Sequence, residues 1–451
     1  MENKRSSFTG KVGFVLAAAG SAVGLGNIWR FPYLAANYGG GIFLLVYLIL
    51  AVTFGFALMM AEIAIGRKTG LSAIEAFKKL KNKWAFVGWI EALIPMIILP
   101  YYAVIGGWVT KYLFEFVTGG GSAAAGDSFF SGFIGQPVAP MIWFAIFLGM
   151  TAVVVFLGVE KGIEKVSKIM MPVLAVLSVI IAVYVVCMPG ALPGVRWYFL
   201  PDFSRFSFTT VLAAMGQLFY SMSLSMGIMI TYGSYMKKDV NLESSVRQIE
   251  IFDTAIAFIA GLMIIPAVFA FSGGNEEALG KGPGLMFVTL PKVFDSMAGG
   301  SFVGKLFFLL VLVAALTSSI SLMETVVSIF RDKLGLSRIK ASFLVLVISI
   351  ILGVPSSLGN GIWANIKIIG MDFLTFFDFA SNSVLMPIVA FFTCIFVGYI
   401  IKPKAIIEEV ELTGKFKSKT LFTILIKYFA PICILLILGC SILEGMGIMK
   451  I

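Results

Sequence analysis

The chain has 451 residues, of which 59% are hydrophobic and only 13% are charged, and its mean hydropathy is +0.99. A soluble globular chain is about 45–50% apolar and about 25% charged, so this composition excludes a soluble enzyme and predicts a polytopic membrane protein. The sequence contains no histidine, which excludes an imidazole metal ligand, general base or proton relay. The formal net charge of +10 has to be interpreted from the positions of the basic residues.

Eleven apolar segments follow one another along the chain. A membrane-spanning helix needs about 20 apolar residues, and these runs are too continuous for the alternating strands of a membrane barrel. The expected spans are residues 10–36, 41–66, 87–116, 138–158, 163–187, 208–235, 248–271, 299–330, 340–358, 366–400 and 421–446. This order predicts an all-α protein with a single transmembrane domain over residues 1–451.

Most of the 34 Lys and Arg residues fall in every second connection between these spans. The largest basic groups lie in residues 67–83, 331–340 and 402–427. Because connections on the cytoplasmic side carry the excess of Lys and Arg, we expect a cytoplasmic N-terminus and, after eleven spans, a C-terminus outside the cell. The positive charge therefore indicates topology in the inner (plasma) membrane. It predicts the lipid bilayer as a partner and does not indicate nucleic acid.

The first and sixth spans contain residues that a lipid-buried helix disfavours. Residues 20–27 read Gly-Ser-Ala-Val-Gly-Leu-Gly-Asn, and residues 221–227 read Ser-Met-Ser-Leu-Ser-Met-Gly. Small residues alone would also serve close helix packing. Interrupted segments at matching positions of two halves, however, are typical of transporters built from inverted repeats, in which freed carbonyls bind a cation. The halves would be residues 1–187 and 208–400, with 421–446 as an additional C-terminal helix.

Charged residues also fall within the expected spans, and five of them are singled out here: Arg30, Glu62, Asp253, Glu324 and Asp372. An unpaired charge in hydrocarbon costs several kcal/mol, so each of them needs a partner or water. For Glu62 and Glu324, a satisfied structural network is the simpler interpretation.

Motifs along nearly the whole chain resemble those of the neurotransmitter:sodium symporter family, in particular its bacterial amino-acid transporters. The strongest is Ala-Val-Gly-Leu-Gly-Asn-Ile-Trp-Arg-Phe-Pro-Tyr at residues 22–33. The others are residues 37–41, 101–102, 217–227, 230–235 and 316–319. The resemblance implies a 5+5 inverted repeat with broken helices 1 and 6, plus one extra helix. It also implies sodium-coupled symport of an amino acid into the cell by alternating access.

The resemblance implies two sodium sites, each built from oxygen ligands, which suit a hard cation. The implied ligands are Ala22, Asn27, Ser221 and Asp253 with the substrate carboxylate at the first site, and Gly20, Val23, Ala314, Thr317 and Ser318 at the second. From the residues alone, the Thr317 and Ser318 hydroxyls would instead bond back to their own helix. No organic cofactor is expected besides the two co-transported sodium ions.

Asp253 departs from the pattern of the family. Many members have an Asn at this position and bind chloride nearby, with a Ser one turn later, where this chain has Ala257. The fixed charge of Asp253 would then do the electrostatic work of chloride. We therefore expect transport to be independent of chloride.

The resemblance also implies an amino-acid pocket at the broken helices. Its expected lining is Ser21, Ala22, Gly24, Leu25, Gly26, Ile98, Tyr102, Tyr220, Ser221, Ser223, Met226, Ser318 and Leu322. The amides of Gly24 and Gly26 and the Tyr102 hydroxyl would meet the α-carboxylate. Met226 is unbranched and adaptable, so we expect hydrophobic L-amino acids, aromatic ones included. Met226 as plain filler is an equally good interpretation, which leaves another small amino acid or an amine as the alternative substrate.

Two opposed gates complete the implied mechanism. Arg30 and Asp372 would form the outer ion pair above an aromatic lid, Tyr220, and Arg5 and Asp332 would form the inner pair. An ion pair that forms and breaks is a suitable two-state element, because its strength rises as water leaves.

A gated ion channel is the alternative that would also explain polar residues at mid-membrane. A channel, however, would not require paired interrupted spans or two opposed gates. A membrane enzyme is not favoured, because the chain has neither a histidine nor a reactive cysteine constellation. Nothing in the sequence specifies an oligomeric state.

Overall fold

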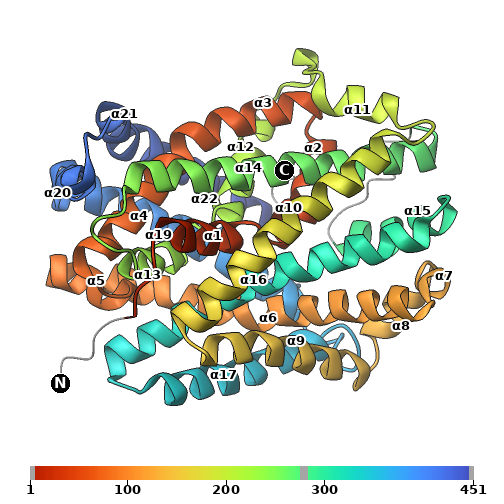
Figure 1. Ribbon diagram of the computed structural model, residues 1–451, viewed down its shortest axis with the longest axis horizontal. Coiled ribbons are helices and arrows are strands. Elements are labelled where there is room, and N and C mark those ends of the chain that lie inside the picture. The colour runs from red at the N-terminus through yellow and green to blue at the C-terminus, as the bar shows by residue number, and fades with distance from the viewer. Residues whose placement is uncertain (1–5, 275–282, 446–451) are drawn as a thin grey trace.

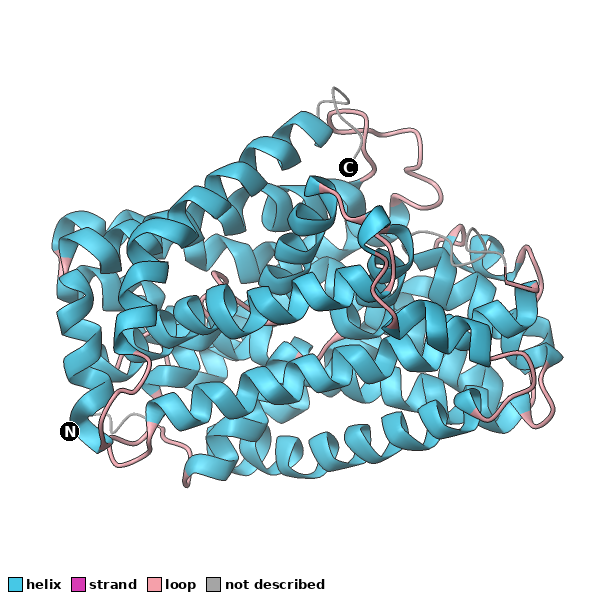
Figure 2. Cartoon of the chain, turned by 90° about the horizontal axis from the view of Figure 1, so that it is seen from above, coloured by secondary structure: helices cyan, strands magenta, loops and turns pink. Residues whose placement is uncertain are grey.

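The computed structural model describes residues 6–274 and 283–445, and within these ranges the chain forms helices and no strand (Figure 2). Nine helical segments of the described chain are long and apolar enough to cross a membrane. A bent pair of helices, Lys11–Ala22 and Gly26–Asn37, makes a tenth span with a bend of 53°. Two further helices flank residues 222–227 and occupy the expected span 208–235. The all-helical membrane architecture, with its first and sixth spans interrupted, is confirmed, whereas the division into two repeats stays a prediction.

The α-helices are labelled in Figure 1 where there is room. They are α1 (Lys11–Ala22), α2 (Phe31–Asn37), α3 (Gly41–Leu50), α4 (Phe56–Thr69), α5 (Ala73–Leu80), α6 (Ala85–Thr118), α7 (Gly121–Ala124), α8 (Phe129–Ile134), α9 (Ala139–Phe156), α10 (Lys165–Val186), α11 (Leu192–Phe199), α12 (Phe208–Ser221), α13 (Ile228–Ser234), α14 (Leu242–Ser272), α15 (Leu290–Ser296), α16 (Gly300–Leu334), α17 (Arg338–Leu358), α18 (Phe373–Asp378), α19 (Met386–Ile395), α20 (Lys402–Val410), α21 (Lys419–Ile424) and α22 (Ala430–Gly445). Short π-helical turns continue several of them within one span, as η1 (Gly26–Arg30) does before α2.

The two breaks have different backbone geometries. Helix α1 ends at Ala22 because Val23 takes an extended conformation, with φ −74° and ψ 102°. The segment between α12 and α13 contains Ser223, Ser225 and Gly227 in the left-handed region, with φ of 52°, 59° and 74°. A residue other than glycine costs about 1–3 kcal/mol in such a conformation and keeps it only where its surroundings hold it. The second break is therefore held in place by tertiary contacts.

The broken helices lie inside a frame of long helices. Helix α1 packs against α10, α14 and α16, and Figure 1 shows α1 in the middle of the molecule with α10 crossing beside it. The two longest helices, α6 and α16, are mostly buried and pack against each other. This frame positions both breaks at the centre of the structure.

Two glycines allow α4 and α13 to touch through their backbones. A Cβ atom built at Gly66 would lie 1.9 Å from the carbonyl oxygen of Ile230, and one at Gly233 would lie 2.4 Å from that of Ile63. No side chain fits at either position without separating the helices. This close approach fixes the position of α13 along α4, and with it the position of the break that precedes α13.

Candidate substrate and cation sites

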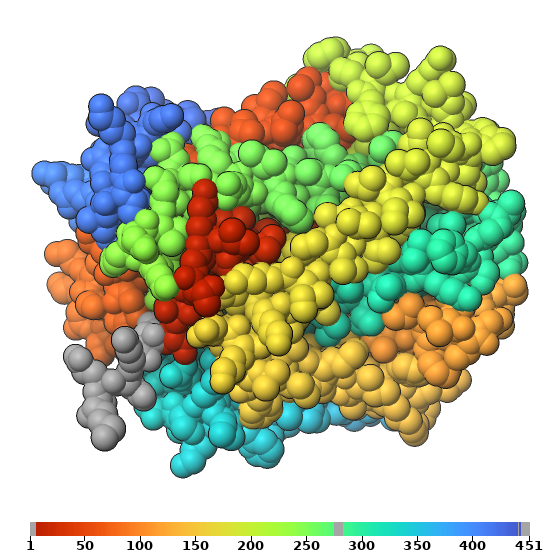
Figure 3. Space-filling view, viewed as in Figure 1, coloured from red at the N-terminus to blue at the C-terminus, as the bar shows by residue number. Residues whose placement is uncertain are grey.

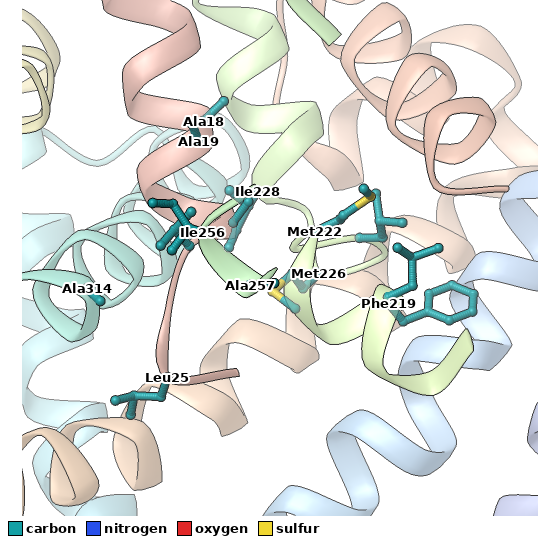
Figure 4. Close-up of a cluster of buried hydrophobic side chains, with 14 of the residues drawn as sticks. Ala18, Ala19, Leu25, Phe219, Met222, Met226, Ile228, Ile256, Ala257 and Ala314 are labelled. Atoms are coloured by element: carbon teal, nitrogen blue, oxygen red, sulfur yellow. The ribbon is translucent and has the colours of Figure 1, made fainter. Parts of the chain in front are cut away.

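A cavity of about 350 Å³ lies at the two breaks. Its lining residues are Ser21, Ala22, Gly24, Leu25, Gly26, Asn27, Ile98, Tyr102, Tyr220, Ser223, Met226, Ile228, Ser318 and Leu322. The structure thus brings all the expected substrate-binding residues but Ser221 to one cavity, and it adds Asn27 and Ile228. Figure 4 shows Leu25 just beyond the end of α1 and Met222 and Met226 in the segment that joins α12 to α13.

The polar side of this cavity is formed by both breaks together with α6 and α16. The backbone N–H of Leu25 donates to the Tyr102 hydroxyl over 3.3 Å. The hydroxyls of Ser223 and Ser318 each donate to the carbonyl oxygen of Ser21 over 3.0 Å. The other side is apolar, with Ile98, Met226, Ile228 and Leu322 among its lining. A cavity of this kind fits a small molecule with a charged end and an apolar end.

The first expected sodium site is a tight cluster of oxygen-bearing side chains with Asp253 at its centre. Asn27 Nδ2 donates to Asp253 Oδ1 over 2.7 Å, and Ser221 Oγ donates to Asp253 Oδ2 over 2.9 Å. The Tyr47 hydroxyl lies 3.3 Å from Ser221 Oγ and 3.5 Å from Asp253 Oδ2. Asp253 is fully buried, and no cationic side chain of the described residues pairs with it. A buried carboxylate without a counter-charge, next to the hydroxyls of Ser221 and Tyr47 and the side-chain amide of Asn27, fits a hard cation.

Sequence reasoning missed Tyr47. It is the single tyrosine of the largely apolar span 41–66, and this isolation is the signal that could have identified it. A fully buried tyrosine hydroxyl needs a hydrogen-bond partner, and here the partners are Ser221 and Asp253.

The second expected sodium site joins the end of α1 to α16. The Thr317 hydroxyl donates to the carbonyl of Ala314 over 3.0 Å, which is the bond within its own helix that the residue type predicts. Ser318 Oγ lies 3.4 Å from the carbonyl oxygen of Val23. A Cβ atom built at Gly20 would lie 3.3 Å from Thr317 Cβ, so the two helices touch there. The structure therefore gathers all five expected ligands, and a role as cation ligands stays a prediction.

The outer gate differs from expectation in one residue. Arg30 lies over the ring of Tyr220, 5.3 Å from its centroid, and both line a second cavity whose acidic residue is Asp378. Asp372 instead caps the N-terminus of α18, where its two carboxylate oxygens accept from the N–H and the hydroxyl of Thr375 over 3.0 and 2.8 Å. The expected pairing of Arg30 with Asp372 was therefore wrong. Asp372 and Asp378 are six residues apart near the start of the same expected span, and the sequence pattern does not distinguish these two acids.

Hydrogen bonds position the Asp378 carboxylate for a role in the outer gate. Its Oδ1 atom accepts from the Tyr101 hydroxyl over 3.1 Å and from Asn382 Nδ2 over 2.6 Å. Tyr101 also lines the cavity that contains Arg30. These two donors fix the carboxylate at the edge of the cavity, within the same lining as the guanidinium.

Neutralising Asp378 should impair transport, whereas neutralising Asp372 should not. We expect Asp378→Asn to lower the rate of sodium-dependent uptake several-fold, because it removes the negative charge that faces Arg30 across the outer cavity. Asp372→Asn keeps a capping side chain and should change the rate little. Uptake rates of the two variants at equal protein density are the measurement. Equal rates would contradict the assignment of the gate to Asp378.

On the inner side, Arg5 lies outside the described residues. Its expected partner Asp332 accepts the backbone N–H of Ser72 through Oδ2 over 2.7 Å. The N-terminal segment that follows Arg5 is anchored by Phe8, which is almost fully buried and whose N–H donates to the Tyr235 carbonyl over 3.0 Å. Figure 3 shows this segment in dark red, between the green chain of α13 and α14 and the yellow chain of α10.

Glu324 belongs to a structural network near the buried Phe8, as expected. It forms an ion pair with Arg338 at 2.5 Å and accepts from the Tyr235 hydroxyl over 2.8 Å. Arg338 also donates to the carbonyl of Val155 over 2.9 Å. The buried charge is therefore fully partnered, and it ties α16 and α17 to the residue that holds Phe8.

Comparison with known proteins gives concordant results. The model of the sodium:neurotransmitter symporter family matches residues 5–122 and 132–448. The chain is 34% identical over 446 residues to the sodium-dependent transporter YhdH of Bacillus subtilis, with 97% of each chain covered. It is 26% identical to the human sodium- and chloride-dependent taurine transporter, with 88% of this chain and 72% of that one covered.

Among solved structures, the chain is similar to MhsT in complex with L-phenylalanine. The TM-score is 0.88 at 40% identity, and the match covers 97% of this chain and 99% of that one. The helical architecture, the two broken spans and the family match agree. The chain therefore belongs to the sodium:neurotransmitter symporter family, as a multi-pass, sodium-dependent membrane transporter and not an enzyme.

Proposed function

We propose that this protein couples an inward sodium gradient to the uptake of hydrophobic L-amino acids, aromatic ones included. The observation that supports this most is the two-sided cavity at the breaks, with hydroxyls and the backbone of residues 21–26 on one side and apolar side chains on the other. The similar structure of MhsT contains L-phenylalanine.

In this proposal the substrate carboxylate lies against the amides of Gly24 and Gly26 and the hydroxyl of Tyr102. Gly26 begins η1 and Gly24 lies two residues before it, so the partial positive charge of a helix N-terminus faces the carboxylate. The carboxylate also completes the coordination of a sodium ion beside Asp253. Substrate and ion then bind together, which is the basis of coupling. The apolar lining around Met226 receives the side chain.

The second sodium ion would link α1 to α16 through Val23 and Thr317. Alternating access follows if the outer cavity closes over Tyr220 while the N-terminal segment anchored by Phe8 moves out of its site. In the other half of the cycle the outer cavity opens and the N-terminal segment returns. The N-terminus would face the cytoplasm and the C-terminus the outside. The ions are substrates of transport, and two per cycle is part of the proposal.

We further propose that transport does not require chloride. Asp253 already provides one fixed negative charge beside Tyr47 and Ser221, and Ala257, one turn later, provides no hydroxyl. A chloride ion next to that carboxylate would meet a like charge in a dry site, which is unfavourable.

Uptake into proteoliposomes tests the proposal. With an inward sodium gradient, we expect saturable uptake of L-phenylalanine and L-leucine, much weaker uptake of glycine, and none of phenethylamine, which lacks the carboxylate. Replacing chloride by gluconate should leave the rate unchanged. Uptake of the amine, or a large loss in gluconate, would contradict the corresponding part of the proposal. Flux without saturation would instead support the channel alternative.

A further inference from the structure

Two buried glutamates, one on α4 and one on α6, accept hydrogen bonds from the break between α12 and α13. Glu62 of α4 accepts the backbone N–H of Ser225 through Oε1 over 2.8 Å. Glu91 of α6 accepts the N–H of Gly227 through Oε1 over 2.9 Å. Ser225 and Gly227 both have positive φ, so the two carboxyl groups bind the strained part of the backbone. Sequence reasoning singled out Glu62 and missed Glu91.

In both residues the second oxygen has no partner. Glu62 Oε2 and Glu91 Oε2 are buried and make no hydrogen bond within the described structure, and both residues are 0% exposed. The two bound N–H groups belong to residues two apart in the chain, so they are separated by about 7 Å at most. The two carboxyl groups thus bind neighbouring points of one short segment and interact electrostatically, and each keeps one buried oxygen without a hydrogen-bond partner.

Other buried glutamates of the described chain have a cation. Glu324 pairs with Arg338 at 2.5 Å, Glu409 with Arg67 at 2.9 Å, Glu164 with Lys168 at 2.7 Å and Glu250 with Arg247 at 3.3 Å. Within the described ranges, Glu62 and Glu91 have no ion pair. A buried carboxylate without a partner is strongly disfavoured, and two of them side by side are more so.

Many charged groups of the surrounding helices are engaged elsewhere, among them Glu324 of α16 with Arg338 and Glu409 of α20 with Arg67. On α5, Glu75 pairs with Lys333, and Lys79 donates to the carbonyl of Thr69. On α14, Asp253 is bound by Asn27 and Ser221. On α19, the Cys394 thiol is buried near Glu62. No described group of α5, α14 or α19 supplies the missing positive charge.

We propose that Glu62 and Glu91 together bind one proton, so that the protein has a proton site linked to the conformation of the α12–α13 break. The proton comes from water and forms one O–H bond on a carboxyl oxygen, and it leaves the pair with a single negative charge. A protonated carboxyl also gains a donor, which the pair otherwise lacks. Both oxygens that face the backbone stay free to accept from Ser225 and Gly227.

Proton binding is linked to transport through the same segment. Ser223 and Met226, which flank Ser225, line the substrate cavity (Figure 4 labels Met226). Loss of the proton leaves two negative charges beneath this segment and favours conformations in which the carboxyl groups separate. By linkage, the arrangement of the break seen here binds more protons than its alternatives and loses stability as the pH rises. The inference depends on the conformation of the break and not on the identity of the substrate.

Infrared difference spectroscopy of the purified, sodium-bound protein tests the proton directly. A protonated carboxylic acid has a C=O stretching band that a carboxylate lacks and that shifts when H₂O is replaced by D₂O. We expect this band in the wild type and its loss in Glu62→Gln and in Glu91→Gln. In each variant the glutamine retains an oxygen that accepts from the backbone N–H. Its NH₂ group replaces the O–H donor of the protonated carboxyl group. Glu408→Gln, at an exposed position, should retain the band. A band that persists unchanged in both variants would refute the proposal.

Thermal stability in saturating sodium gives a second readout that needs no substrate. Asp253 is unchanged in the wild type and in both variants, so its titration cancels when their profiles are compared. Between about pH 6 and 9 the Tm of the wild type should fall relative to that of both Gln variants, because only the wild type has a proton to lose. Parallel pH profiles in the wild type and the two variants would show a purely structural role and overturn the proposal. Failure of L-phenylalanine uptake would affect the proposed substrate and leave both readouts interpretable.

Discussion

Replacing Asp253 by Asn should lower the apparent affinity for sodium by about 10- to 100-fold and reduce uptake accordingly. The carboxylate is fully buried and is contacted by Asn27, Ser221 and Tyr47. Interactions of polar groups with a charged partner contribute about 1.5–3 kcal/mol each, which corresponds to this range. The amide would also direct an NH₂ group at the cluster, where Asn27 Nδ2 already donates.

Sodium titrations of L-phenylalanine uptake measure the effect. Asp239→Asn, at an exposed position between α13 and α14, is the matched control and should leave the sodium dependence unchanged. The same titration in chloride and in gluconate separates the two functions assigned to Asp253. If Asp253→Asn regains part of its uptake in chloride but not in gluconate, the fixed charge of Asp253 takes the place of a bound chloride ion. An unchanged sodium affinity in Asp253→Asn would contradict the first cation site.

Replacing Gly24 by Ala should abolish most substrate binding while leaving the fold intact. The added methyl group would lie 2.5 Å from Ser318 Oγ and 3.0 Å from the Tyr102 hydroxyl. Both side chains line the cavity on its polar side, so they would have to move into the space of the substrate carboxylate. Overpacking of this kind costs about 1–3 kcal/mol, or about 5- to 150-fold in affinity.

Gly216 provides the control for this prediction. It lies in α12, where an added Cβ would meet no atom within 4 Å, and alanine favours a helix over glycine. Gly216→Ala should therefore bind L-phenylalanine as the wild type does, with equal or higher thermal stability. Binding to purified protein in sodium is the measurement. Normal affinity in Gly24→Ala would argue that the substrate lies elsewhere.

The membrane architecture could be predicted because it depends on features local in sequence. Continuous apolar runs of about 20 residues must form helices in lipid, since their backbone groups have no other partner. Glycines and serines in residues 20–27 and 221–227 likewise marked the breaks, because a lipid-facing helix does not favour them. Both breaks are present in the structure.

The pairing of individual acids could not be predicted in the same way. Asp372 and Asp378 both follow a polar loop at one end of the same span, and only the folded chain places Asp378 on the cavity of Arg30 and Asp372 at a helix cap. Glu91 lies in an apolar run of α6 with nothing nearby in sequence to mark it. Its partner, the N–H of Gly227, is 136 residues away.

The sequence by itself thus determined the spans, the two interruptions and the residue types that gather there. It did so because lipid burial and backbone hydrogen bonding act on each segment separately. The tertiary structure alone decided which buried acids meet a cation, a hydroxyl or a second acid. Those interactions join helices far apart in the chain, and they depend on the packing of α4, α6, α14 and α18 around the two breaks.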